Sequence, residues 1–123
     1  MHSRNFAHLD IKHDNIVLDD EINPKLADFG FTQHPAAPIN TFAGAPYYKA
    51  PEINPKVGPY DGKKADIYAM GVVFYSLLMC CYPSDEKSPP VIENLKFPEN
   101  ISQMIIDIIK AMLSYNPNER PSA

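Results

Sequence analysis

The stretch that decides the fold is residues 64–81, KADIYAMGVVFYSLLMCC, a run without proline in a chain that holds 13 prolines. Between residues 67 and 82 the single plainly polar side chain is that of Ser76. A helix that crosses a membrane needs about 20 apolar residues, and this run is shorter. A helix that is apolar on all sides and too short for a membrane is a buried core helix. The stretch therefore predicts a central helix with Asp66 near its start.

A second helix is predicted over residues 102–114. Ser102 is its expected N-cap, and Pro117 marks the end of the run. Its apolar residues recur at spacings of three and four, which places them in one stripe on the helix surface. The stripe is formed by Ile101, Met104, Ile105, Ile108, Ile109, Met112 and Leu113. Packing of this stripe against the core is sufficient to explain it.

The first part of the chain predicts short strands. Residues 16–18 and 25–27 are strand candidates, and residues 19–24 between them have the composition of a turn. This pattern predicts a β-hairpin. Residues 32–62 are rich in proline and hold three of the five glycines, so a long irregular segment is expected there. The expected fold is therefore mainly α with a small β-hairpin.

Composition limits the classes of function. With 123 residues, 45% of them hydrophobic, and a net charge of −4, the chain can build one core and is no disordered tail. Its mildly acidic balance argues against nucleic-acid binding, which needs a basic face.

Cys80 and Cys81 are adjacent, so a disulfide between them would close almost no loop, and we expect reduced thiols on the buried helix. Residues 1–6 lack the apolar region of a signal peptide. These features predict a cytoplasmic or other reducing intracellular compartment, and no nucleic-acid or membrane partner.

Acidic residues of the N-terminal half are expected to gather at one place. Asp10 and Asn15 flank one loop, and the predicted hairpin would carry Asp28 back beside them, together with Lys12. Carboxylate and amide oxygens are the hard ligands that suit Mg²⁺. Mg²⁺ with a lysine is what a polyphosphate needs, and a carboxylate beside them could take a proton from a hydroxyl group. The cluster predicts phosphate chemistry.

The motifs, taken in order, resemble those of the eukaryotic protein kinases of the serine/threonine type. Residues 8–15, HLDIKHDN, are similar to the catalytic loop pattern H-R-D-L-K-x-x-N. Five further stretches match in order: 28–30 (DFG), 44–49 (GAPYYK, similar to the segment that faces the substrate), 50–52 (APE), 66–71 (DIYAMG, similar to the start of the central helix of the large lobe) and 116–121 (NPNERP). Together they span nearly the whole chain.

The resemblance implies a fold. Residues 1–123 would form part of a protein kinase domain, namely the large (C-terminal) lobe, truncated at both ends and without the small lobe. Its parts would be the catalytic loop 8–15, the magnesium loop 28–30, the activation segment 28–52, the central helix 64–81 and the late helix 102–114.

The resemblance also implies roles in catalysis. Asp10 would be the base that orients and deprotonates the hydroxyl group of a protein substrate. Lys12 would contact the transferring phosphate of ATP, and a lysine here is typical of serine/threonine kinases. Asn15 and Asp28 would hold two Mg²⁺ ions. Val17 would form the floor under the adenine ring.

A structural set is implied as well: His8, Phe29, Gly30, Glu52, Asp66 and Arg120. His8 and Phe29 would belong to a packed column that keeps the magnesium loop aimed inward. Asp66 would anchor that column to the backbone of the catalytic loop. Glu52 and Arg120 would form a buried ion pair.

Several residues depart from the kinase pattern. Leu9 replaces an arginine that normally pairs with a phosphate on the activation segment. Thr41, the candidate phosphorylation site, would lack this partner, so we expect activity that does not depend on its phosphorylation. Ala45 replaces a threonine that usually hydrogen-bonds the catalytic aspartate and lysine. Tyr68 and Asn116 replace a tryptophan and an aspartate, which are tolerable packing or turn changes.

The chain contains no G-x-G-x-x-G motif and no lysine of the V-A-I-K type, so a missing small lobe or a partner chain is expected to complete the ATP site. By itself the chain is expected to be inactive. Three interpretations stay open. The first is the large-lobe portion of a serine/threonine kinase, favoured by the retained acidic and lysine residues. The second is a non-catalytic pseudokinase or scaffold, favoured by Leu9, Ala45 and the absent small lobe. The third is an incomplete gene model.

Overall fold

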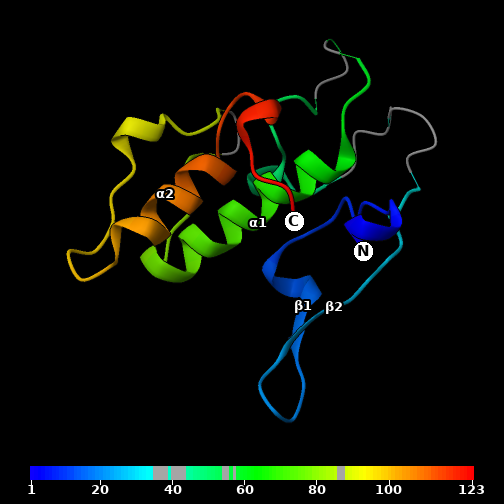
Figure 1. Ribbon diagram of the computed structural model, residues 1–123, viewed down its shortest axis with the longest axis horizontal. Coiled ribbons are helices and arrows are strands. Elements are labelled where there is room, and N and C mark those ends of the chain that lie inside the picture. Colours follow the sequence, from blue (N-terminus) through cyan, green and yellow to red (C-terminus); the bar gives the residue numbers. More distant parts are fainter. Residues whose placement is uncertain (35–38, 40–43, 54–55, 57, 86–87) are drawn as a thin grey trace.

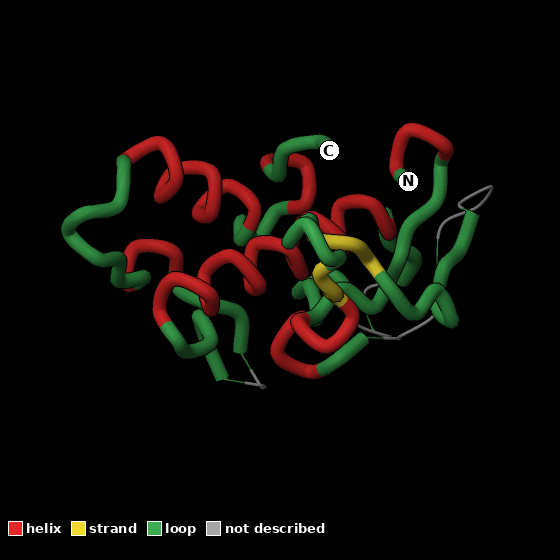
Figure 2. Tube along the Cα trace, turned by 90° about the horizontal axis from the view of Figure 1, so that it is seen from below, coloured by secondary structure: helices red, strands yellow, loops and turns green. Residues whose placement is uncertain are grey.

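The central helix α1 spans Gly62–Met79, and α2, which spans Gln103–Met112, lies alongside it (Figure 1). A computed structural model of the chain describes residues 1–34, 39, 44–53, 56, 58–85 and 88–123. The strands β1 (Ile16–Leu18) and β2 (Pro24–Leu26) form a two-stranded antiparallel sheet. Figure 2 shows the molecule from below, with the two short strands near the middle of the view. The prediction of a mainly helical fold with a small hairpin is confirmed.

The hairpin follows the predicted pattern closely. Ile16 pairs with Leu26 and Leu18 with Pro24, so the second strand begins one residue earlier than predicted. Asp19 closes the turn, because its Oδ1 accepts hydrogen bonds from the main-chain N–H groups of Glu21 (3.1 Å) and Asn23 (2.8 Å). Asp19 therefore stabilises the turn through local hydrogen bonds to the main chain, as is usual for Asp in turns.

Helix α1 begins and ends two residues earlier than predicted. Asp61 is its N-cap, and Asp61 Oδ1 accepts a hydrogen bond from Lys63 N at 2.8 Å. The helix ends where Cys80 adopts a left-handed φ of 53°, and Cys80 N donates to Ser76 O at 2.9 Å. Cys80 and Cys81 therefore lie beyond the helix, and both are free and exposed. The prediction of thiols on a buried helix was wrong because the helix stops before them.

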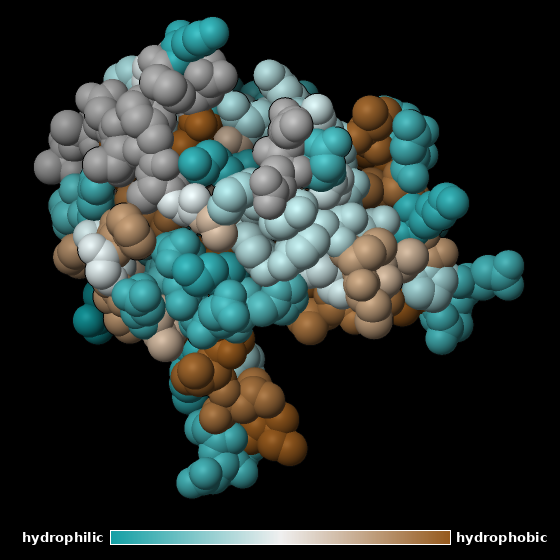
Figure 3. All heavy atoms as spheres, turned by 180° about the vertical axis from the view of Figure 1, so that it is seen from behind, coloured by the Kyte–Doolittle hydropathy of each residue, from teal (hydrophilic) through white to brown (hydrophobic). Residues whose placement is uncertain are grey.

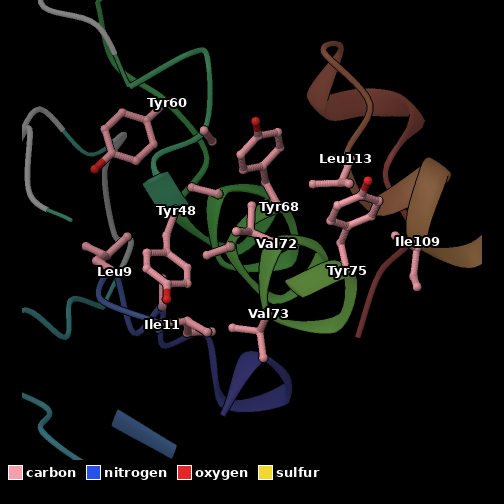
Figure 4. Packing of buried hydrophobic residues seen from close by; sticks show 14 of the residues in the cluster. Leu9, Ile11, Tyr48, Tyr60, Tyr68, Val72, Val73, Tyr75, Ile109 and Leu113 are labelled. Carbon is pink, nitrogen blue, oxygen red and sulfur yellow. The ribbon is translucent and has the colours of Figure 1, made fainter. Parts of the chain in front are cut away.

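A cluster of buried side chains surrounds the first two thirds of α1 (Figure 4). It joins the helix to the first part of the chain, to residues around 48 and 60, and to α2. Its labelled members are Leu9, Ile11, Tyr48, Tyr60, Tyr68, Val72, Val73, Tyr75, Ile109 and Leu113. Position 62 has no room for a side chain. A Cβ there would lie 2.8 Å from Ala7 Cβ and 2.9 Å from Leu9 Cδ2, which is too close for packed atoms.

The last third of α1 is less buried than predicted. Phe74 is 42% exposed and Leu77 is 64% exposed. The hairpin stands off from this end of the helix and leaves a hollow of about 600 Å³, with Leu18 on one wall and Phe74 and Leu77 on the other. Figure 3 shows apolar side chains gathered on the projecting hairpin. The expectation of a helix buried on all sides therefore fails at its C-terminal end.

The apolar stripe of α2 divides in the same way. Ile109, Met112 and Leu113 are buried against α1, whereas Met104, Ile105 and Ile108 are exposed. Ser102 stands at the N-cap position as predicted, but its side chain makes no capping hydrogen bond. Within the described residues, neither helix combines the length and the apolar character needed to cross a membrane.

Candidate active site

Residues 8–15, the expected catalytic loop, are anchored to the first turns of α1 by one buried carboxylate. Asp66 is 2% exposed, and its Oδ2 and Oδ1 accept hydrogen bonds from the main-chain N–H groups of His8 (2.7 Å) and Leu9 (2.8 Å). His2 Nε2 lies 2.9 Å from Asp66 Oδ2. Leu9 has a left-handed φ of 67°, which is costly for a branched side chain. The two hydrogen bonds that His8 N and Leu9 N donate to Asp66 hold the loop in this conformation.

Asp10, Lys12 and Asn15 form a tight cluster in that loop. Lys12 Nζ donates to Asp10 Oδ2 at 2.8 Å, and Asn15 Nδ2 donates to the same oxygen at 2.9 Å and to Asp10 O at 2.8 Å. The hydrogen bond to Asp10 raises the pKa of Lys12 above its ordinary value, and the negative charges of Asp10, Asp14 and Asp28 add to this effect. Lys12 therefore remains a cation at neutral pH.

The hairpin returns Asp28 to this cluster. Ala27 N donates to Asn15 O at 2.8 Å, so the residue after it lies beside the catalytic loop. Asp28 is exposed and has a φ of 56°, and its Oδ1 accepts a hydrogen bond from Gly30 N at 3.2 Å. A Cβ at position 30 would lie 3.1 Å from that oxygen, tighter than most real contacts. The structure thus brings together the four residues that the sequence placed at the site.

The oxygen atoms at this place suit Mg²⁺ chemically. Asn15 turns its Nδ2 toward Asp10, which leaves its amide oxygen on the opposite side. Asp28 offers an exposed carboxylate. Among the described residues there is no group of three or more His, Cys, Asp or Glu side chains that could hold a metal ion. Mg²⁺ usually binds through one or two protein oxygens together with substrate phosphates, so a carboxylate and an amide fit that ion.

His8 connects residues 8–15 to the expected magnesium loop, residues 28–30. Its Nε2 lies 3.0 Å from Ala27 O and its Nδ1 accepts from Asp10 N at 3.3 Å, so the ring is neutral with the hydrogen on Nε2. The ring centroid lies 5.3 Å from that of Phe29. Phe29 is 56% exposed, however, so the enclosed column expected from the sequence is open on the Phe29 side. Phe29 and the preceding Asp28 both lie at the surface.

Glu52 and Arg120 form an ion pair with two parallel hydrogen bonds. Arg120 Nη1 donates to Glu52 Oε1 at 2.6 Å and Nη2 donates to Oε2 at 2.8 Å. The Arg120 side chain is fully buried and also donates to Ser114 O and Lys64 O at 2.9 Å each. Its guanidinium carbon lies 4.9 Å from the centre of the Tyr68 ring, and burial raises the pKa of Tyr68 to about 12. The pair joins the APE stretch to α1 and to the C-terminal residues.

The other predicted residues occupy distinct places. Val17 is 49% exposed on β1, so an apolar surface is open there. Leu9 is buried and belongs to the core cluster around α1. Ala45 and Asp10 line the same small cavity of about 20 Å³. Thr41 lies outside the described residues.

Sequence reasoning missed His13. Its Nδ1 lies 2.7 Å from Tyr48 Oη and its Nε2 lies 3.2 Å from Ser76 Oγ. A signal was present, because Ser76 is the one plainly polar side chain in the apolar run. Nothing in the sequence pairs it with a histidine 63 positions away.

Known proteins are similar to this chain over nearly its whole length. The family model described as "Protein kinase domain" matches residues 1–123. The chain is 38% identical over 129 residues to serine/threonine-protein kinase kin-29 of Caenorhabditis briggsae, which covers 98% of the chain and 16% of that protein. It is 37% identical over 134 residues to serine/threonine-protein kinase dst3 of Dictyostelium discoideum, and the match covers 100% of the chain and 24% of that protein. It is 36% identical over 127 residues to CBL-interacting serine/threonine-protein kinase 5 of Arabidopsis thaliana, and the match covers 99% of the chain and 26% of that protein. The chain thus spans about a quarter or less of these relatives.

Proposed function

The chain belongs to the protein kinase domain family, and from that premise we propose that residues 1–123 form part of the large lobe of a serine/threonine protein kinase. The proposed reaction transfers the γ-phosphate of ATP to a serine or threonine hydroxyl group of a protein. The observation that carries the proposal is the Asp10 carboxylate, held between Lys12 Nζ at 2.8 Å and Asn15 Nδ2 at 2.9 Å.

Asp10 is the proposed base. A carboxylate has about four lone-pair positions, so the two donors at Oδ2 leave acceptor capacity for a substrate hydroxyl group. The hydroxyl oxygen forms a bond to the γ-phosphorus, the bond from that phosphorus to the bridging oxygen of ADP breaks, and the hydroxyl proton passes to Asp10. The Lys12 ammonium group offsets negative charge on the transferring phosphate. Its raised pKa keeps it available for this task.

Asn15 and Asp28 are the proposed ligands of Mg²⁺. When bound, that ion neutralises negative charge on the phosphates of ATP. The role of this chain's own residues is to hold the two oxygens on the same side of the catalytic loop. The hydrogen bond between Ala27 N and Asn15 O supports that arrangement. Val17, exposed on β1, is the proposed apolar floor for adenine.

The test is a phosphate-transfer assay on the full-length gene product that carries this chain. Labelled ATP is supplied with Mg²⁺ and with peptide mixtures that contain serine, threonine or tyrosine as the acceptor. We expect label on serine or threonine, and an Asp10→Asn loss of about 10²–10⁴-fold. Asp20→Asn, the same change in the exposed hairpin turn, serves as the control and should retain activity. Equal activity of wild type and Asp10→Asn would contradict the proposal.

A non-catalytic scaffold is the second candidate. It is favoured by the buried Leu9 and by Ala45, whose methyl group beside Asp10 cannot form a hydrogen bond. The same assay separates the two candidates. A folded wild-type protein whose transfer rate equals that of Asp10→Asn is a scaffold, and a faster wild type is an enzyme.

A further inference from the structure

His13 connects three segments that are distant in the sequence. It begins the 3₁₀ turn His13–Asn15, directly after Lys12, in the catalytic loop. Its Nδ1 lies 2.7 Å from the hydroxyl group of Tyr48, in residues 44–49, which we call the substrate-facing segment. Its Nε2 lies 3.2 Å from Ser76 Oγ on α1. One imidazole ring thus uses both of its nitrogens to tie the loop to two other segments.

The positions of the hydrogens follow from the partners of Ser76. Ser76 Oγ lies 2.7 Å from Val72 O and 3.1 Å from Val73 O, and its single hydrogen serves these carbonyl groups. Toward His13 the hydroxyl oxygen therefore accepts, so the ring hydrogen is on Nε2. In the neutral ring Nδ1 is then an acceptor, and Tyr48 donates to it. Burial raises the pKa of Tyr48, so this hydroxyl group keeps its proton.

Tyr48 is itself held on its other side. Its hydroxyl oxygen lies 3.1 Å from that of Tyr82, just beyond the end of α1. The ring of Tyr82 stacks on Tyr47 with centroids 4.2 Å apart and planes 8° from parallel. Tyr48 is 7% exposed and belongs to the core cluster around α1. The substrate-facing segment is therefore clamped between His13 and Tyr82.

The hydrogen bond between His13 and Tyr48 matters because the side chain of Ala45 cannot form a hydrogen bond between the substrate-facing segment and the loop that carries Asp10. Ala45 lies in the substrate-facing segment and lines the same small cavity as Asp10, but its methyl group neither donates nor accepts a hydrogen bond. The bond between His13 and Tyr48 is a direct polar link between the loop that carries Asp10 and the segment expected to bind the acceptor peptide.

We propose that His13, through its hydrogen bond to Tyr48, is a positioning residue that sets where the acceptor hydroxyl group lies relative to Asp10. The proposal rests on the proposed kinase function. His13 touches neither substrate nor phosphate in this role. Loss of the link displaces the substrate-facing segment, so the turnover of the acceptor peptide falls, while ATP, which contacts other residues, binds as before.

The first experiment measures kinetics of the full-length gene product with Tyr48→Phe, which removes one oxygen and keeps the ring. We expect kcat for peptide phosphorylation to fall about tenfold, because small misplacements of reacting groups are costly. The KM for ATP should not change. Tyr115→Phe, the same change at an exposed tyrosine, is the matched control and should behave as wild type. His13→Ala combined with Tyr48→Phe should lose less than the sum of the two single losses, because both variants remove the hydrogen bond between His13 and Tyr48.

The second experiment needs no activity. Imidazole ¹⁵N spectra of the full-length gene product should show His13 with its hydrogen on Nε2. In Tyr48→Phe the Nδ1 signal should shift, and in Tyr115→Phe it should not.

The outcomes are distinguishable. An active wild type whose peptide kcat is unchanged by Tyr48→Phe overturns the positioning role and leaves the kinase function standing. Additive losses in the double variant also overturn it. A wild type that transfers no phosphate overturns the proposed function, and the positioning role with it.

Discussion

Asp66 Oδ1 accepts a 2.8 Å hydrogen bond from the main-chain N–H of Leu9, a residue 57 positions earlier whose φ is 67°. A left-handed conformation costs about 1–2 kcal/mol for a residue with a side chain. A hydrogen bond to a charged group contributes about 1.5–3 kcal/mol, and Asp66 accepts a second one from His8 N. The buried carboxylate therefore more than offsets the strain, and it makes the catalytic loop depend on α1.

Asp66→Asn should lower the free energy of unfolding by about 2–4 kcal/mol, since an amide can accept only one of the two hydrogen bonds well. Chemical denaturation followed by circular dichroism measures the change. Asp61→Asn, at the exposed N-cap of the same helix, is the control, because Asn and Asp cap equally well. A similar stability for the two variants would refute the anchoring role.

Gly62→Ala should cost about 1–3 kcal/mol, because the new methyl group would overlap Ala7, Leu9 and Ile39 in a packed core. The cost is measured by the same denaturation experiment. Ile39→Val removes the Ile39 Cδ1 atom that would be contacted, so the double variant should recover part of the loss. Strict additivity of the two changes would mean that crowding is not the cause.

Glu52→Gln should destabilise the fold by about 3–5 kcal/mol, because it leaves the fully buried Arg120 guanidinium without its opposite charge. Urea titration of the variant and wild type measures this. Glu93→Gln makes the same change at an exposed site and should alter stability little. A loss below about 1 kcal/mol, the size typical of surface pairs, would show that the pair is not structurally important.

Ala45→Thr should raise turnover of the full-length gene product if the site is competent, because a hydroxyl group would be added beside Asp10, whose neighbouring cavity is about 20 Å³. Peptide phosphorylation rates measure the effect. Ala45→Val has nearly the same shape as threonine without the hydroxyl group, so it should give no gain. An equal response to threonine and valine would exclude a hydrogen-bonding explanation.

The hairpin turn should loosen in acid. The hydrogen bond from Asn23 N is the first cause that holds the pKa of Asp19 below its ordinary value of 3.8, and Lys25 assists. A lowered acid pKa stabilises the fold above the unfolded value, and the contribution is lost as pH falls through the folded value. Amide NMR shifts of Glu21 and Asn23 should therefore change together below about pH 4. Asp19→Asn should abolish that transition, and a transition that persists in this variant would assign it to another group.

Much of the site was readable because its signals are local. The proline-free apolar run predicted α1 and the spacing of apolar residues predicted α2, each to within two residues at each end, and the alternation of apolar pieces and turn residues predicted the hairpin. Motif order placed Asp10, Lys12, Asn15 and Asp28 in one cluster, and the structure brings them together. These predictions depend on residues near one another in the sequence, where spacing translates directly into geometry.

Exposure could not be read in the same way. Phe74, Leu77 and Ile108 are apolar, which predicts that they are buried, yet all three are exposed. Whether a helix face is buried depends on which distant segment of the chain packs against it. Phe29 is half open for the same reason. Cys80 lies outside the helix because a left-handed residue ends it, a feature that composition does not reveal.

By itself the sequence determined the helices, the hairpin and the set of residues that carries the proposed chemistry, since these follow from period, turn composition and motif spacing. Only the tertiary structure decided how the set is held. The Asp66 anchor on Leu9 and the His13 link to Tyr48 and Ser76 join residues 35 to 63 positions apart. Such hydrogen bonds are satisfied only after packing excludes water and orients both partners, so their pairing belongs to the folded chain and not to any local pattern.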